Sequence, residues 1–529
     1  MASGLCKQFS VDSSEQSYTI DFASSLSPGR SIGIEVCIVS NGSLDTPGKN
    51  RMTHSLFYVL LLTAGAYCQW DHHMKDGRQS IVHLFEWKWS DVASECEKFL
   101  APYWLGGVQV SPANEHRVVT EEQWRPWWER YQPVSYSMVS RSGDRAEFID
   151  MVNRCNAVNI NIYVDVVFNH MCEDGNSEGD FNDDICDSDI QQYNNEWEVR
   201  NCRLSGLVDL KLSKTYVRDK IVEFLNDLIS LGVAGFHVDA CKHMYPEDLE
   251  VIYGQLNDLV TPTFPSGSRP FIVQEVIDYG GEAISATEYA HLGRVTEFKY
   301  GRELSNCFRG NNDLKYLYNW GEALGLLPRG NALSFIDNHD TQRNHGGGGN
   351  PLTYKEPREY KMAVSFMLAH DYGVPRIMSS YYFTEGEAGP PSHPDGSTKD
   401  VTCFDEWVCE HRWRQITASS WFRKVTNGTG VDNWWDNNSN QIAFSRGSLG
   451  WYAVNNDAYA MNATIYTGLP AGTYCNLYVS SYDKDTKACV KMEDVGTPST
   501  VTVKSNGDAS VYISNNSNPV IVIHVDATV

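Results

Sequence analysis

Eight short apolar segments, separated by helical or loop-rich stretches, are the feature of this 529-residue sequence that most constrains its fold. Short apolar runs that end in polar residues are typical of buried strands in a parallel sheet. Alternation of such strands with helices, in eight units over roughly 350 residues, predicts a (β/α)8 TIM barrel. The segments are Ser80–Phe85, Gly107–Val110, Ile160–Phe168, Gly235–Val238, Phe271–Val273, Val295–Phe298, Leu333–Ile336 and Val374–Met378.

The sequence changes character at two places outside these segments. Residues 169–209 are rich in Gly, Asp and Asn and have few periodic apolar residues, which predicts a short loop-rich insertion after the third strand. After about residue 421, short alternating segments predict a C-terminal antiparallel β-sandwich domain. We therefore expect the barrel in residues 69–168 and 210–420, the insertion in 169–209 and the β-domain in 421–529.

The N-terminal part has the pattern of a secretory signal set back from the first residue. Lys49 and Arg51 precede the apolar run Leu56–Leu62, and the small residues Ala64–Ala66 follow it. This run is too short to span a membrane. We expect residues 52–68 to be a signal peptide, and residues 1–51 to be an extension that is disordered or missing from the mature protein.

Composition narrows the compartment and the partners. The 14 cysteines favour an oxidising, extracellular location, so we expect a secreted protein. The net charge of −24 argues against a nucleic-acid partner, because binding to phosphate needs a basic surface. We expect no membrane partner and a monomer. The 15 tryptophans suit either an aromatic core or a sugar-binding cleft, and composition leaves both open.

Five acidic residues lie within or just beyond the carboxyl ends of predicted strands: Asp165, Asp239, Glu275, Asp337 and Asp340. In a TIM barrel this end of the strands forms the active-site face, so the fold brings the five acids to one rim. Retaining glycoside hydrolysis needs one carboxylic acid to protonate the leaving oxygen and one carboxylate to attack the anomeric carbon. Crowding separates the pKa values of such groups. The pattern therefore favours a glycoside hydrolase.

Other interpretations of the same rim stay open at this point. His170, His243 and His339 could be ligands in a metal-dependent hydrolase built on the same barrel. The compact His-x-His or His-Glu-x-x-His spacing of such sites is missing. For Asp239 alone, a buried structural ion pair is also an interpretation, since a carboxylate at the end of a buried strand is costly unless it is paired or takes part in function.

Five motifs occur in order: WRPWWERYQPVSY (Trp124–Tyr136), DVVFNH (Asp165–His170), GFHVDACKH (Gly235–His243), QEVID (Gln274–Asp278) and FIDNHD (Phe335–Asp340). With these motifs the sequence resembles the animal-type α-amylases of the α-amylase clan of glycoside hydrolases, from about residue 69 to the end. The resemblance implies that Asp239 is the nucleophile, Glu275 the general acid/base and Asp340 a third carboxylate that positions the sugar. The implied reaction is retaining endo-hydrolysis of α-1,4-glucosidic bonds in starch, glycogen or malto-oligosaccharides.

The resemblance also implies a structural calcium ion, a substrate-binding set and disulfides. Calcium would be held by Asn169, Asp209 and His243 and by the backbone carbonyl of Arg200. Oxygen ligands suit this hard cation, and His243 would offer its backbone carbonyl. The substrate-binding set is Trp127, Trp128, Tyr131, His170, Lys242, His339 and His345. The implied disulfides are Cys96–Cys155, Cys186–Cys202, Cys403–Cys409 and Cys475–Cys489, which leaves Cys172, Cys241 and Cys307 as thiols in the part of the chain that resembles the family.

Two departures from the family pattern are visible. The excursion between residues 169 and 209 is shorter than in relatives by roughly a few tens of residues, and Val139 stands where a further cysteine would be. His237 replaces an arginine that, with the residues matching Asn338 and Arg376, is a chloride ligand in relatives. Histidine is charged only conditionally, so we expect weak or absent chloride activation. A starch-binding paralogue with weak or no catalysis is the alternative function, although all three acids are present.

Overall fold

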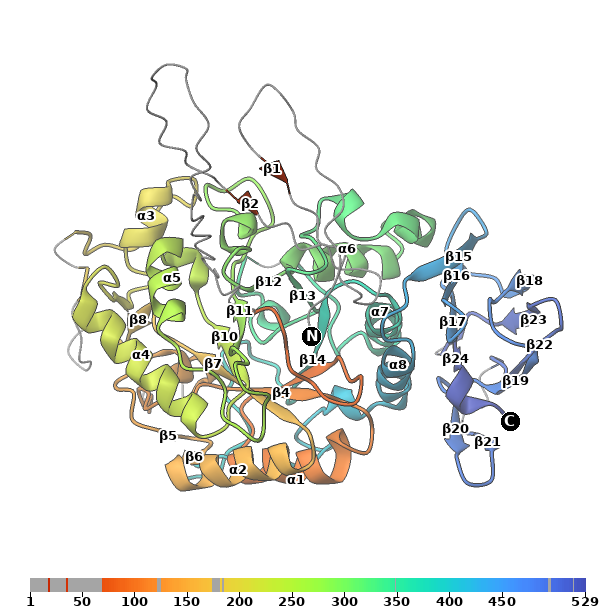
Figure 1. Cartoon of the computed structure of the whole chain (residues 1–529), viewed down its shortest axis with the longest axis horizontal. Helices are drawn as coiled ribbons and strands as arrows, with labels where there is room; N and C mark the ends of the chain where they lie inside the picture. The colour runs from red at the N-terminus through yellow and green to blue at the C-terminus, as the bar shows by residue number, and fades with distance from the viewer. Residues whose placement is uncertain are drawn as a thin grey trace, which may run out of the picture. The chain divides into compact units, whose positions relative to one another are not determined.

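A closed barrel of eight parallel strands forms the centre of the structure, a computed structural model, as Figure 1 shows. Each strand is hydrogen-bonded to the next around the ring, and β14 pairs with β3 to close it. The predicted barrel is confirmed. In chain order its strands are β3 (Ile81–Leu84), β4 (Gly107–Val110), β7 (Asn161–Val166), β10 (Gly235–Val238), β11 (Phe271–Gln274), β12 (Arg294–Thr296), β13 (Ala332–Ser334) and β14 (Val374–Ser379).

The structure describes residues 69–120, 125–173, 181–182, 185–347, 349–492, 496–516 and 518–529. It also describes the backbone of the paired strands β1 (Tyr18–Thr19) and β2 (Glu35–Val36), which belong to a separate unit of residues 1–65. The expected signal peptide at 52–68 and, apart from these two strands, the expected extension at 1–51 lie outside the described residues. No helix in the described ranges is both long and apolar enough to cross a membrane.

Helices follow most of the barrel strands and cover the outside of the ring (Figure 1). The α-helices are α1 (Trp89–Glu95), α2 (Arg145–Ala157), α3 (Glu196–Asn201), α4 (Thr215–Ser230), α5 (Pro246–Gly254), α6 (Phe298–Phe308), α7 (Pro357–Ala369) and α8 (Arg414–Val425). Shorter helical turns are η1 (Cys96–Leu100), η2 (Trp127–Tyr131), η3 (Cys241–His243), η4 (Ala286–Tyr289), η5 (Leu314–Asn319), η6 (Glu322–Leu324), η7 (Thr341–Arg343), η8 (Glu410–Arg412) and η9 (Val525–Ala527).

The ends of two elements illustrate how local sequence sets them. Helix α2 begins with a capping box, in which the Asp144 side chain accepts from the backbone N–H of Glu147 and the Glu147 side chain accepts from that of Asp144. The sixth strand ends earlier than the predicted boundary at Phe298. The Glu297 side chain accepts from the Lys299 backbone N–H, so the chain turns into α6 at Phe298.

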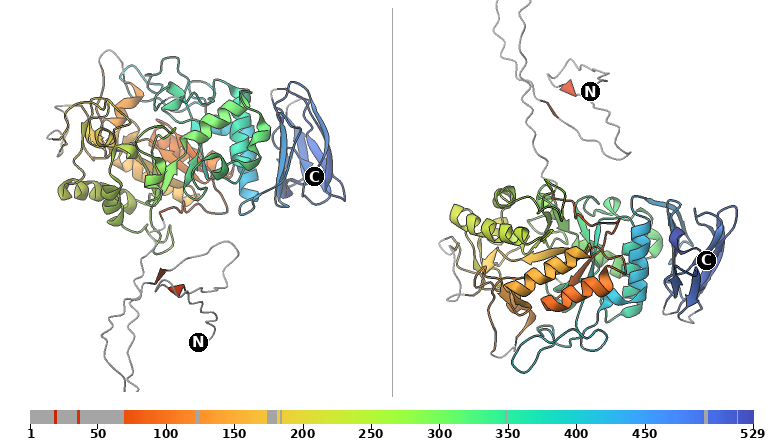
Figure 2. Two further views of the ribbon diagram at one scale, coloured as in Figure 1. Left: turned by 90° about the horizontal axis from the view of Figure 1, so that it is seen from above. Right: turned by 60° about the horizontal axis from the view of Figure 1, so that its bottom comes forward.

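The C-terminal domain is a sandwich of two four-stranded antiparallel sheets, which Figure 2 shows lying face to face. Trp451 and Ile521 are among the apolar side chains buried between them. The domain contacts the barrel helices, since Arg446 Nη1 donates to the Ala369 carbonyl at 2.6 Å. One sheet contains β15 (Val431–Asp436), β16 (Gln441–Arg446), β17 (Gly450–Asn455) and β24 (Val520–His524); the other contains β18 (Met461–Tyr466), β19 (Gly472–Cys475), β22 (Thr500–Val503) and β23 (Asp508–Ile513). A hairpin of β20 (Ser480–Asp483) and β21 (Ala488–Lys491) is separate.

The insertion after β7 has little regular structure, as predicted. It contains α3 and the short pair β8 (His170–Met171) and β9 (Val208–Asp209); the hairpin of β5 (Val139–Ser140) and β6 (Gly143–Asp144) lies earlier in the chain. The structure has all four expected disulfides, with sulfur–sulfur distances of 2.01–2.11 Å. The remaining described cysteines, Cys172, Cys241 and Cys307, are buried.

Candidate active site

A cleft of about 710 Å³ lies at the carboxyl ends of the barrel strands. Asp239 directly follows β10, Glu275 directly follows β11, and Asp340 lies after β13 at the start of η7. The fold therefore delivers one carboxylate from each of three strand ends to the same cavity. Every residue predicted as catalytic or substrate-binding lines it: Asp239, Glu275, Asp340, Trp127, Trp128, Tyr131, His170, Lys242, His339 and His345.

Asp239 and Glu275 are buried, Asp340 is half-buried, and the charges of the three groups interact. Burial raises the pKa of Asp239 well above its usual value, and the negative charge of Glu275 raises it further. Burial and Glu275 also raise the pKa of Asp340. Glu275 Oε2 accepts from the Ala240 backbone N–H at 3.3 Å. Ala240 has a φ of 53°, and this uncommon left-handed conformation turns the chain from β10 into η3 beside the nucleophile candidate.

Aromatic rings form one wall of the cleft. The rings of Tyr131 and His339 are stacked with centroids 4.9 Å apart, and Trp127 meets both edge-on. The Tyr131 hydroxyl donates to Asp165 Oδ2 at 2.8 Å, which fixes the ring. Burial, together with the positive charge of Arg376, lowers the pKa of His339 well below its usual value, so its imidazole is neutral. This wall is rigid and apolar, with a polar edge.

Two acidic residues in the loops at the mouth of the cleft, Glu282 and Glu387, pair with predicted substrate-binding residues. Lys242 Nζ donates to the Ile277 carbonyl at 2.8 Å and forms an ion pair with Glu282. His345 Nε2 lies 2.9 Å from Glu387 Oε1, which joins two loops across the rim. Glu282 and Glu387 belong to no motif and are far in sequence from their partners. Only the three-dimensional fold reveals them.

The predicted chloride residues lie behind the carboxylates in the barrel interior. His237 Nδ1 donates to Asp165 Oδ1 at 2.8 Å, and Arg376 Nη1 donates to Gln109 Oε1 at 2.8 Å. Within the described residues, three buried nitrogens of this set have no hydrogen-bond partner: His237 Nε2, Asn338 Nδ2 and Arg376 Nη2. Asn338 Nδ2 and Arg376 Nη2 are buried donors, and an anion would satisfy such donors; the neutral His237 ring, which donates from Nδ1, has a lone pair at Nε2.

The predicted calcium residues fall into two neighbouring pairs. Asn169 and Asp209 are joined through the β8–β9 ladder, where the Leu210 N–H donates to the Asn169 carbonyl at 2.9 Å. His243 is joined to the turn of helix that carries Arg200, because its Nδ1–H donates to the Val199 carbonyl at 3.0 Å. Asn169 Oδ1 is buried and lacks a partner among the described residues. An orphaned amide oxygen beside a carboxylate and backbone carbonyls fits a hard cation.

The histidines do not form the metal site of the alternative interpretation. His170 Nε2–H donates to the Tyr131 carbonyl at 3.0 Å, and burial lowers the pKa of His170 to about 4. The His243 ring donates a hydrogen bond to the Val199 carbonyl, and the His339 ring is stacked on Tyr131. In the part of the chain that the structure describes, no cluster of three His, Cys, Asp or Glu side chains could hold a metal ion.

Comparison with known proteins identifies the family. The α-amylase of Oryzias latipes is 50% identical over 518 residues, which cover 89% of this chain and 99% of that relative. The chain belongs to the α-amylase family. Pancreatic α-amylase 2a5 of Mus musculus is 51% identical over 515 residues, again covering 89% of this chain and 99% of the relative. Residues 432–526 also match the family model for the α-amylase C-terminal all-beta domain.

Solved α-amylase structures agree with this assignment. A mutant of α-amylase I from Eisenia fetida, solved in complex with maltohexaose, superimposes with a TM-score of 0.81 and is 47% identical; the match covers 86% of this chain and 99% of that one. The wild-type enzyme from the same organism gives the same TM-score at 48% identity. This chain is therefore an α-amylase and a glycoside hydrolase, as its motifs predicted.

Proposed function

We propose that this α-amylase cleaves internal α-1,4-glucosidic bonds of starch, glycogen and malto-oligosaccharides with retention of configuration, using Asp239 as nucleophile and Glu275 as general acid/base. The observation that supports this most strongly is the presence of three carboxyl groups, from three separate strand ends, in one cleft walled by aromatic rings. Retention requires the two working carboxyl groups to lie about 5 Å apart. Asp239 and Glu275 are close enough that the charge of Glu275 raises the pKa of Asp239, after the larger effect of burial.

The chemistry then follows two steps. The Glu275 carboxyl gives its proton to the glycosidic oxygen while the Asp239 carboxylate attacks the anomeric carbon, which forms a glycosyl–enzyme ester and releases the first product. Glu275, now ionised, takes a proton from water, and the resulting hydroxide displaces Asp239. Asp340 contacts the same sugar and stabilises the positive charge that develops on its ring. Tyr131 and Trp127 hold the ring by stacking, and they exclude water from one side.

We propose that the Asn169 and Asp209 side chains and the backbone carbonyls of Arg200 and His243 hold one calcium ion. The orphaned Asn169 Oδ1 supports this site. When bound, the ion supplies a fixed positive charge that links the insertion to the barrel end beside the cleft.

We propose that chloride has little effect on this enzyme at neutral pH. The His237 imidazole donates to Asp165 from Nδ1, so in its neutral form the ring presents a lone pair at Nε2. A lone pair repels an anion, and Nε2 becomes a donor only when His237 is protonated. An arginine at this position would donate at every pH.

We also propose that the protein is secreted and acts as a monomer, with the domain boundaries given by the sequence. The four disulfides support an extracellular location. The activity test is hydrolysis of soluble starch by the wild-type protein and by Asp239→Asn, with the anomer of the first product recorded by NMR. The proposal predicts an α-anomer from the wild type and almost no product from the variant. If the wild-type protein leaves starch intact, the proposed hydrolysis is wrong, and a starch-binding paralogue without catalysis becomes the better interpretation.

A further inference from the structure

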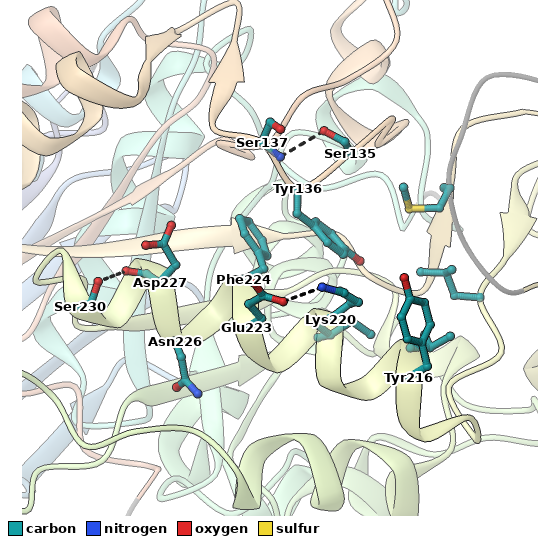
Figure 3. A pocket seen from close by; sticks show the side chains of 14 residues that line it. Ser135, Tyr136, Ser137, Tyr216, Lys220, Glu223, Phe224, Asn226, Asp227 and Ser230 are labelled. Carbon is teal, nitrogen blue, oxygen red and sulfur yellow. Dashed lines mark hydrogen bonds and ion pairs between the residues drawn. The ribbon is translucent and has the colours of Figure 1, made fainter.

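A second and larger groove, of about 1020 Å³, runs along the outer face of α4 and shares no lining residue with the catalytic cleft. The loop at residues 135–137 forms its opposite wall, and Figure 3 shows Tyr136 reaching over the helix from that side. Met171, at the start of the insertion, and Leu210, directly after it, also line it. The groove therefore lies beside the two ends of the insertion.

One helical stripe carries the groove's polar side chains. Tyr216, Lys220, Glu223, Asp227 and Ser230 follow each other at intervals of three or four residues, which places them on one face of α4. Fourteen residues separate the first from the last, so the stripe is about 21 Å long. This length accommodates several sugar rings.

The aromatic groups of the groove are presented as platforms. Tyr216 is 61% exposed although its ring is large and apolar. Tyr136 is stacked on Phe224 with centroids 4.8 Å apart and an interplanar angle of 12°, which holds its ring in place. The Tyr136 hydroxyl is buried and has no hydrogen-bond partner among the described residues, so the groove presents the ring of Tyr136 and not its hydroxyl.

The charges of the groove are balanced internally. Lys220 Nζ lies 2.8 Å from Glu223 Oε2, and Asp227 accepts from Arg145 Nη2 at 2.7 Å. A groove with paired charges offers little attraction to a phosphate, a nucleic acid or a charged peptide. Flat rings together with serine, amide and paired ionic groups instead suit a neutral ligand that is rich in hydroxyl groups.

We propose that this α4 groove is a second binding site for α-glucan chains, which holds starch while the catalytic cleft cuts it. The inference rests on the proposed function for the identity of the sugar. A polymer that reaches both sites is retained by avidity, because binding at one site raises the effective concentration at the other. The groove is built on a helix and needs no rearrangement to bind.

The test uses variants of the full chain that carry Asp239→Asn, so that bound glucan is not cut. Calorimetry with maltoheptaose is expected to find two sites in Asp239→Asn and one in Asp239→Asn combined with Tyr216→Ala. Adsorption to granular starch is expected to fall about threefold to tenfold on loss of the Tyr216 platform. Tyr318→Ala is the matched control, since Tyr318 is 63% exposed and lines neither site.

Equal thermal midpoints for the two tyrosine variants would show that the fold is intact. Unchanged stoichiometry and adsorption in Tyr216→Ala would overturn the proposal. So would a dimer in sedimentation experiments that Tyr216→Ala dissociates without affecting adsorption, because the groove would then be an interface between two copies. Hydrolysis of a soluble maltotrioside by the unmodified enzyme tests the proposed function separately.

Discussion

Removing the His237 side chain tests the buried pair that lies beneath the active site. Asp165 is 0% exposed and His237 is 2% exposed, and their side chains are 2.8 Å apart; the Tyr131 hydroxyl also donates to Asp165, and the charge of Arg376 also attracts it. A hydrogen bond to a charged group contributes about 1.5 to 3 kcal/mol, and a buried charged group that loses a partner costs more than a neutral one. Loss of His237 leaves the buried Asp165 carboxylate with a single hydrogen-bond donor, the Tyr131 hydroxyl. We expect His237→Ala to lower the free energy of unfolding by about 3 kcal/mol.

The assay is urea unfolding at neutral pH, followed by tryptophan fluorescence with the disulfides intact. His237→Ala is measured in the wild-type background and in an Asp165→Asn background. The account expects most of the loss to disappear with Asp165→Asn, because no buried charge is then left unpaired. His237→Arg is expected to retain most of the stability, since a donor to Asp165 remains. Equal losses in the two backgrounds would refute the reasoning and would attribute the effect to lost packing alone.

Three further predictions concern the charged groups around the cleft. Folding raises the pKa of Asp239 above its unfolded-state value of 3.8. Protonated Asp239 therefore contributes to the free energy of unfolding at low pH, and this contribution is lost as the pH rises through the raised pKa of the folded state. Asp239→Asn is therefore expected to abolish activity yet raise the thermal midpoint at pH 7, with a smaller gain at pH 3; a lower midpoint at pH 7 would contradict this. Chelation by EDTA is expected to lower the thermal midpoint, and less so in Asn169→Ala; equal shifts would argue against calcium at Asn169. His237→Arg is expected to introduce chloride activation. It is also expected to move the acid limb of the pH profile of kcat/KM to lower pH, because a permanent cation lowers the pKa of nearby carboxylates. If chloride activates the wild type and His237→Arg does not change that activation, this explanation is wrong.

Local sequence predicted the barrel because every strand carries its own signal. The strand Gly107–Val110 has the predicted bounds, since its apolar run specifies it without reference to the rest of the chain. Helices α6 and α8 were not predicted. Helix α8 precedes the C-terminal domain, and the packing of α8 against α7 and β24 supports it more than any periodic pattern in its sequence does.

The site was predictable to the extent that it is encoded in motifs. The acids after β10, β11 and β13 could be placed at one rim because a parallel barrel aligns the carboxyl ends of its strands. Glu387, which meets His345 across the mouth, and Glu282, which pairs with Lys242, could not be found in this way. Their positions depend on loop conformations that no local pattern specifies. The partner of His237 likewise emerged only from the register of β10 against β7, which sets it opposite Asp165.

The measurement that tests the central claim most directly is trapping of the covalent intermediate. A 5-fluoro maltosyl fluoride would be turned over slowly by the enzyme, and mass spectrometry of a digest would locate the labelled carboxylate. The account predicts one label per molecule, on Asp239, and none in Asp239→Asn. A label on Glu275 or Asp340, or an enzyme that hydrolyses starch without ever taking up the label, would contradict the assignment of Asp239 as the nucleophile.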